Sequence, residues 1–100
     1  MAMSSRLQGF IQILREQRPR LMEQYNVAAL EIFGSHIRHE ERKDSDLDIL
    51  VTFTKAPSLL MFVHLENQLS DLLGVKVDLV MKDSLKPAIG KSILKEAMPV

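Results

Sequence analysis

The sequence predicts an α+β fold, in which a small mixed β-sheet packs against helices. The prediction rests on an apolar stripe with helical spacing in the first quarter of the chain, on short strand-like runs, and on a long apolar helix that separates the last two runs. The chain has 100 residues, of which 46% are hydrophobic and 26% charged. We therefore expect residues 1–100 to form a single domain.

The apolar stripe begins at Leu7 and reaches Tyr25, with apolar residues at spacings of three, four and seven. Such spacing places them on one face of a helix. Pro19 interrupts the pattern, because proline lacks the backbone N–H and clashes with the preceding turn. We expect a helix over residues 5–17 and a second, short helix over residues 19–25, since proline suits the first position of a helix.

The expected sheet comprises three apolar runs, namely residues 28–33, Leu47–Phe53 and residues 75–81. The spacer between the first two runs is too short for a crossover helix, so we expect them to pair antiparallel. Pro57 and Ser58 open a helix that Gly74 ends, and this connection allows the second and third runs to lie parallel. A last helix is expected over residues 89–97.

The composition argues against a nucleic-acid-binding protein, a membrane protein and a secreted protein. With 13 basic and 13 acidic residues the formal net charge is zero, which argues against nucleic-acid binding by this chain alone. No apolar run approaches the roughly 18 residues of a membrane span, and the first residues lack the apolar core of a signal peptide. The absence of cysteine fits a reducing compartment. We expect a cytoplasmic protein without a membrane anchor.

The candidate site is a Gly34-Ser35 pair followed, after ten residues, by Asp46-Leu47-Asp48. Alternate residues of a strand face the same way, so Asp46 and Asp48 project together. Asp78 in the third run offers another carboxylate if the two strands are neighbours. Two unit charges 4 Å apart repel by about 4 kcal/mol at an effective dielectric near 20, so such a cluster needs a cation. Oxygen ligands favour Mg²⁺ or Mn²⁺.

The turn at Gly34 and Ser35 is suited to phosphate. Glycine lets the backbone approach a phosphate closely, and the serine hydroxyl can donate a hydrogen bond. A metal site beside a phosphate turn indicates phosphoryl or nucleotidyl transfer, in which two metal ions activate the attacking oxygen and stabilise the leaving group. Taken singly, Gly-Ser is more often only a turn and Asp-x-Asp a solvated strand edge, and Asp78 could face solvent. The combined spacing and the flanking strands favour the functional interpretation.

Three segments carry a resemblance to a known family: Ile32-Phe33-Gly34-Ser35, Ser45-Asp46-Leu47-Asp48-Ile49-Leu50-Val51 and Val77-Asp78-Leu79-Val80. They resemble the minimal nucleotidyltransferases of the DNA polymerase beta superfamily, and the similarity extends from about Leu7 to Val100. The resemblance implies the nucleotidyltransferase fold, ATP as substrate and two Mg²⁺ ions. It also implies that Asp46, Asp48 and Asp78 bind the metals and are catalytic, with Asp78 activating the acceptor hydroxyl. Gly34, Ser35 and Arg38 would hold the triphosphate.

The resemblance implies a partner as well. Minimal nucleotidyltransferases are often antitoxins of toxin–antitoxin pairs that transfer AMP from ATP to a tyrosine of a HEPN-domain ribonuclease toxin and so inactivate it. We therefore expect a protein adenylyltransferase that forms a hetero-oligomer with a HEPN toxin. Two alternatives stay open: a non-catalytic antitoxin that masks the toxin by contact, and a nucleotidyltransferase acting on a small molecule or RNA.

His36 and His39 follow the turn, where family members often carry arginine and glycine. A zinc site at these histidines is conceivable, but solvated loop positions are the favoured interpretation. His64 stands alone on a predicted helix and is expected to be structural.

Overall fold

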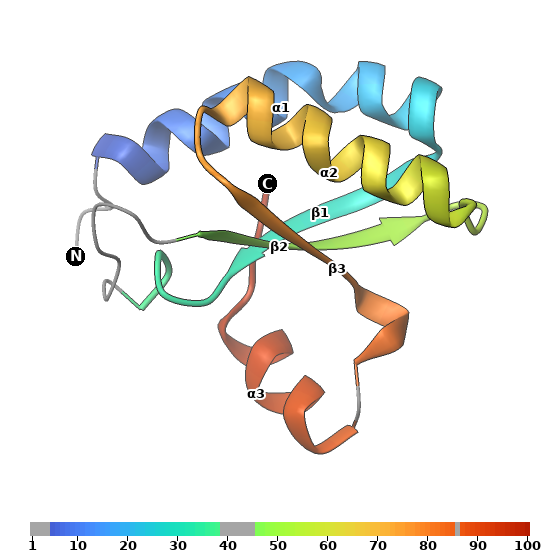
Figure 1. Ribbon diagram of the computed structural model, residues 1–100. Coiled ribbons are helices and arrows are strands. Elements are labelled where there is room, and N and C mark those ends of the chain that lie inside the picture. The colour runs from blue at the N-terminus through green and yellow to red at the C-terminus, as the bar shows by residue number, and fades with distance from the viewer. Residues whose placement is uncertain (1–4, 39–45, 86) are drawn as a thin grey trace.

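The computed structural model in Figure 1 describes residues 5–38, 46–85 and 87–100. Four strands form one sheet in the order β3-β2-β1-β4. Helices α1 and α2 lie together on one side of this sheet, and α3 lies on the other side (Figure 1). The arrangement is the α+β fold that the sequence predicts.

Helix α1, Ser5–Tyr25, is continuous and contains Pro19. The predicted break after residue 17 is therefore wrong. Proline within a helix costs roughly 3 kcal/mol, yet the buried face of α1 continues on both sides of it, from Leu14 to Leu21. Burial of apolar side chains on both sides of Pro19 offsets this local cost.

The strands β1, Val27–Phe33, and β2, Leu47–Phe53, pair antiparallel, and β2 pairs parallel with β3, Val77–Met81. The antiparallel pairing was predicted, the parallel pairing is the one that the helical connection allowed, and the bounds of β2 agree with the expected run. The strand β4, Met98–Pro99, was not predicted; it pairs antiparallel with β1. A strand of two residues is too short to show an alternating pattern.

Helix α2, Leu59–Leu73, ends as the sequence predicts. Ser58 caps its start by accepting a hydrogen bond from the Met61 N–H at 3.2 Å, and Gly74 follows its end in the left-handed conformation. A short 3₁₀ turn, η1, spans Lys82–Ser84, and α3 spans Pro87–Glu96, so it begins two residues before the expected start.

The hydrophobic core lies between the sheet and the pair α1 and α2, which Figure 1 shows covering one face. Helices α1 and α2 and strands β1 and β2 all contribute core side chains that are at most 1% exposed: Leu14, Val27, Leu30, Ile32, Leu47, Ile49, Val51, Leu65 and Leu69. None of the helices within the described residues has both the length and the apolar character that crossing a membrane requires.

Candidate active site

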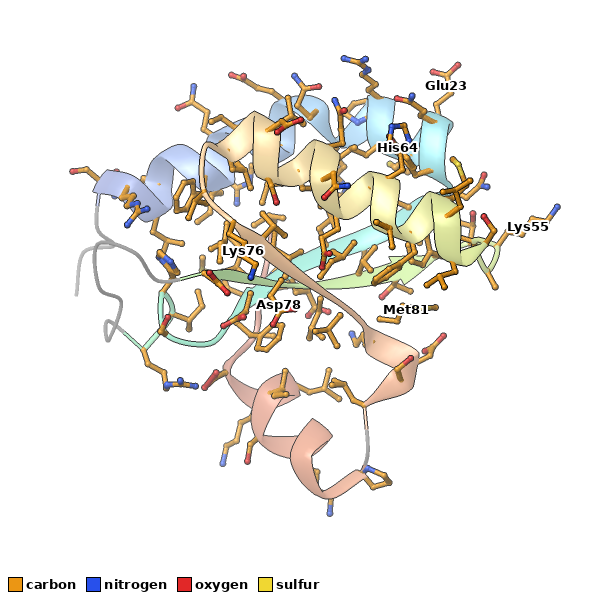
Figure 2. The ribbon with its side chains drawn as sticks, in the orientation of Figure 1. Glu23, Lys55, His64, Lys76, Asp78 and Met81 are labelled. Carbon is orange, nitrogen blue, oxygen red and sulfur yellow. The ribbon has the colours of Figure 1, made fainter. Side chains whose placement is uncertain are left out.

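The predicted carboxylates gather at one end of β2 and β3. Asp48 and Asp78 are direct partners in the parallel register, and Asp46 immediately precedes β2. Leu47 and Ile49, on either side of Asp48, are fully buried, whereas Asp48 is only half-buried. The alternation therefore turns the acids to the face of the sheet opposite α1 and α2, where Figure 2 labels Asp78.

The edge strand β3 is tied to α2 on both sides of Asp78. The Val77 N–H donates to the Ser70 hydroxyl at 3.0 Å, and the Leu79 N–H donates to the Glu66 carboxylate at 2.9 Å. Both backbone groups lie at the free edge of the sheet, so these bonds replace a missing neighbouring strand. They fix β3 against α2 and thereby fix the position of Asp78. Sequence reasoning missed Glu66 and Ser70, because nothing local marks them as partners of a strand.

The electrostatics of Asp48 show that the acids act on one another. Burial is the main cause that raises the pKa of the Asp48 carboxyl from 3.8 to about 6. The carboxylates of Asp78 and Asp46 raise this pKa further, and Arg38 opposes them by lowering it. Among residues 5–38, 46–85 and 87–100, Asp46 has only a long contact with a cation, 4.0 Å to the exposed Lys76 ammonium. A bound cation would relieve this repulsion.

The donor chemistry fits a divalent metal, since three carboxylates are the oxygen ligands that Mg²⁺ prefers. In residues 5–38, 46–85 and 87–100, however, no three His, Cys, Asp or Glu side chains form a cluster ready to hold an ion. Mutual repulsion opposes the approach of carboxylates when no cation is bound. Asp46, Asp48 and Asp78 are thus brought to one place by the strands, while their role as metal ligands stays a prediction.

The glycine turn lies against the acids. Gly34 has a φ of +83°, which favours glycine, and a Cβ atom added there would lie 2.9 Å from the Asp48 carboxyl carbon. Two consecutive N–H groups, those of Ile37 and Arg38, then donate to the Gly34 carbonyl at 3.1 Å and close the turn. Ser35 is part of this turn and is partly exposed. The predicted phosphate turn and the predicted metal ligands are therefore neighbours.

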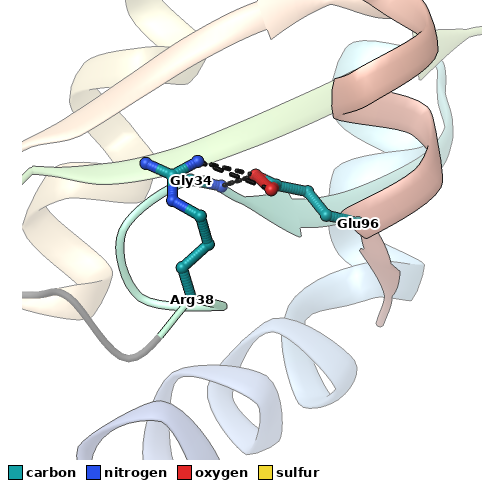
Figure 3. A network of polar contacts seen from close by, with 3 residues as sticks. All are labelled: Gly34, Arg38 and Glu96. Carbon is teal, nitrogen blue, oxygen red and sulfur yellow. Dashed lines mark hydrogen bonds and ion pairs between the residues drawn. The ribbon is translucent and has the colours of Figure 1, made fainter.

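Glu96, the last residue of α3, reaches into this turn (Figure 3). Its carboxylate accepts a hydrogen bond from the Gly34 N–H at 3.0 Å and pairs with the Arg38 guanidinium at 3.0 and 3.4 Å. Sequence reasoning placed Glu96 only within a helix. One signal was available: an acid in the last turn of a helix is unfavourable for the helix dipole, so its position suggests a partner elsewhere.

His36 is buried, with 1% of its surface exposed, so its interpretation as a solvated loop residue is wrong. The turn directs its ring toward α1, where it meets Phe10 edge to face with centroids 5.7 Å apart. Neither ring nitrogen has a hydrogen-bond partner within the part of the chain that the structure describes. His39 lies outside the described residues. His64 contacts Tyr25, whose hydroxyl lies 3.4 Å from its Nδ1, which agrees with a structural role.

Comparison with known proteins decides the family. Residues 16–100 match the family model described as polymerase beta, nucleotidyltransferase. The chain belongs to this nucleotidyltransferase family. It is also 49% identical over 88 residues to the protein adenylyltransferase MntA of Thermococcus cleftensis, a match that covers 88% of this chain and 89% of the relative. This nucleotidyltransferase is thus similar, over nearly its full length, to an enzyme named for AMP transfer.

Solved structures agree with the fold of this nucleotidyltransferase. A candidate minimal nucleotidyltransferase superposes with a TM-score of 0.76 at 37% identity, covering 92% of this chain and 94% of that one. A toxin–antitoxin structure with AMP-PNP superposes with a TM-score of 0.69 at 20% identity, covering 96% of this chain and 72% of that one. At that identity the second likeness bears on the fold alone.

Proposed function

We propose that this protein is the antitoxin of a toxin–antitoxin pair and transfers AMP from ATP to a tyrosine of a HEPN-domain ribonuclease toxin. One observation carries the proposal: the register that sets Asp48 opposite Asp78, with the Gly34 turn beside them. The similarity to a named protein adenylyltransferase supports the same activity. One solved structure with a chain of similar fold is the complex of a tri-AMPylated HEPN toxin of Shewanella oneidensis with an MNT antitoxin.

In this proposal the chain's own residues divide the work. Asp46, Asp48 and Asp78 hold Mg²⁺, which supplies stabilisation of the charge that develops on the phosphates. The Gly34 turn, the Ser35 hydroxyl and Arg38 bind and orient the triphosphate, for which backbone N–H groups and a guanidinium are suited. Fixed donors of this kind lower the barrier mainly by positioning the reacting groups.

The transfer step exchanges one bond of the α-phosphorus of ATP for another. The tyrosine oxygen of the toxin forms a bond to this phosphorus, and the bond from the phosphorus to the bridging oxygen of the β-phosphate breaks. Pyrophosphate leaves with the electron pair, and the proton of the tyrosine passes to Asp78. Asp78 is exposed on the edge strand β3, so a side chain carried by another protein has access to it.

The acceptor comes from a partner in this proposal, so the protein acts as a single domain within a hetero-oligomer. Residues 5–38, 46–85 and 87–100 show one sheet and its covering helices, without a separate unit to bind an acceptor. We place the reaction in the cytoplasm, where ATP is available. A chain without cysteine has no disulfide bonds that a reducing medium could break.

Intact mass spectrometry tests the proposal. A HEPN-domain partner is incubated with this protein, ATP and Mg²⁺, and a parallel reaction contains Asp46→Ala. The expected result is added mass in multiples of AMP with the native protein only. Neutralisation of the toxin without added mass would instead make the protein a binding antitoxin, and added AMP on a small molecule without a partner would favour the other alternative.

A further inference from the structure

The contact between α3 and the glycine turn carries an inference that rests on the proposed function. The Glu96 carboxylate is an anion, and it accepts hydrogen bonds from the Gly34 N–H and the Arg38 guanidinium. In the proposed function these are the donors that bind the triphosphate. We propose that Glu96 sets the nucleotide affinity of this protein by occupying the Gly34 N–H and the Arg38 guanidinium until ATP displaces it. Glu96 is thus an internal competitor of the triphosphate.

The competition follows from the donors themselves. A carboxylate and a phosphate both accept hydrogen bonds from a backbone N–H and from a guanidinium. The Gly34 N–H carries one hydrogen, and it is directed at the Glu96 carboxylate over 3.0 Å. Arg38 presents the same nitrogen to both carboxylate oxygens, at 3.0 and 3.4 Å. A phosphate oxygen cannot take the Gly34 hydrogen while the carboxylate holds it.

The backbone near Glu96 is anchored, so the competitor stays close to the turn. The chain enters β4 two residues later, where Met98 pairs with Ile32 of β1. The Val100 N–H then donates to the Leu30 carbonyl at 3.0 Å. Gly34 directly follows β1, and Glu96 lies two residues before β4, so the pairing of β1 with β4 holds the two sides of the contact together. A short tether of this kind gives a high effective concentration of the carboxylate at the turn.

The contact remains open to displacement. The Arg38 side chain is 48% exposed and that of Glu96 is 25% exposed, and ion pairs accessible to water are weak. Rotation of the Glu96 side chain would free both donors without moving β4. The charge of Glu96 supports the competition separately, because it adds a fourth carboxylate near Asp46, Asp48 and Asp78, and this added negative charge disfavours an incoming triphosphate.

A different role for Glu96 predicts the opposite sign. If its only task were to hold Arg38 and the turn in place, removing its charge would loosen the turn and weaken nucleotide binding. If it competes with phosphate, removing its charge strengthens binding. Glu96→Gln keeps the size of the side chain and removes the charge, so the direction of the change separates the two roles.

Calorimetric titration of the purified protein with AMP-PNP and Mg²⁺ measures the change. We expect Glu96→Gln to lower the Kd about fivefold, the factor by which an ion pair this exposed shifts an equilibrium. In the transfer reaction KM for ATP should fall with little change in kcat. The control is Glu23→Gln, which removes one negative charge at the far end of α1 (Figure 2) and should leave Kd unchanged.

A second measurement uses the native protein, in case Glu96→Gln does not fold. The ¹³C resonance of the Glu96 carboxyl and the amide resonance of Gly34 should both shift on saturation with AMP-PNP and Mg²⁺. Binding that leaves the Glu96 resonance in place, or a Kd that rises or stays the same in Glu96→Gln, overturns the inference alone. Folded native protein that binds no nucleotide overturns the proposed function and this inference together.

Discussion

Asp48 of β2 and Asp78 of β3 lie directly opposite one another on neighbouring parallel strands. Like charges placed opposite each other destabilise a sheet, and here burial of Asp48 adds to the cost. A fold that contains such a pair is less stable than one without it. Proteins commonly lose stability in this way at sites where function requires strained or charged groups. The pairing of the two aspartates predicts measurable effects on stability and, under the proposed function, on the binding of Mg²⁺.

Asp48→Asn should stabilise the metal-free protein at neutral pH. The pKa of Asp48 is raised in the folded protein to about 6, so the folded state binds this proton more tightly than the unfolded state and loses stability as pH rises from about 4 to about 6. The variant removes this penalty, for a gain of about 1 kcal/mol at pH 7 that vanishes below pH 4. Urea unfolding at both pH values, with Asp71→Asn as control, measures it; an equal gain at both would contradict the assignment.

Binding of Mg²⁺ should weaken as the solution is acidified. Protons compete with the metal for the Asp48 carboxylate at and below pH values near its pKa of about 6. The rise in Tm produced by a fixed Mg²⁺ concentration should therefore be larger at pH 7.5 than at pH 5. Asp48→Asn should reduce this rise at both pH values, and chelation of the metal should stop AMP transfer. A rise in Tm that does not depend on pH would argue against Asp48 as a ligand.

Gly34→Ala should destabilise the protein by about 2 kcal/mol and remove transfer activity. The φ of +83° disfavours any side chain, and the new Cβ would collide with the Asp48 carboxylate. Gly9→Ala is the matched control, because Gly9 lies within α1 and a Cβ atom added there would meet no neighbouring group within 4 Å. That control should gain up to about 1 kcal/mol. Thermal unfolding of the two variants tests the contrast, and a tolerated Gly34→Ala would refute the close approach.

Glu66→Ala should slow transfer more than it lowers stability. Loss of the bond to the Leu79 N–H costs about 1 kcal/mol, since water can reach the edge of the sheet. The larger effect is on Asp78, which loses one of the two bonds that hold its strand against α2. We expect kcat to fall about tenfold with Asp78 misplaced. Asp71→Ala, an exposed acid on the same helix, is the control and should leave kcat as in the native protein.

His36→Leu should leave stability unchanged or raise it by about 1 kcal/mol. The ring is buried beside Phe10 without a hydrogen-bond partner among the described residues, so an apolar side chain of similar size satisfies the site better. His64→Leu provides the contrast, because it removes the contact with the Tyr25 hydroxyl and should be destabilising. Loss of stability in His36→Leu would show that the ring has a polar partner after all.

Local signals in the sequence were enough to predict the elements that carry the acids. A high content of Ile, Val, Thr and Phe identifies Leu47–Phe53, and Ser58 with Gly74 bounds the helix that allows the β2–β3 pair to be parallel. These signals act over a few residues and need no distant partner. The position of Asp78 beside Asp48 did not follow from them, because a helical connection allows two strands to run parallel but does not determine that they are neighbours.

The features that sequence reasoning missed all depend on contacts between distant segments. Pro19 stays within α1 because Leu14 and Leu21, on either side of it, are both buried in the hydrophobic core. The burial of His36 depends on Phe10, and the place of Glu96 depends on the pairing of β4 with β1. Each of these is a tertiary effect that outweighs a local preference. Apart from the unfavourable place of Glu96 in the last turn of a helix, no local signal in the sequence indicated them.

The strand order places the two halves of the candidate site in regions that differ in mechanical character. Asp48 belongs to β2, which has a bonded strand on each side, so the amides around it should exchange with solvent most slowly. Glu96 and Arg38 meet at the periphery through side chains that are partly exposed to water. The half of the candidate site that carries the aspartates is thereby rigid, and the half at the glycine turn is adjustable. Such a site can keep its acids in register while the surrounding turn responds to the arrival and departure of a nucleotide.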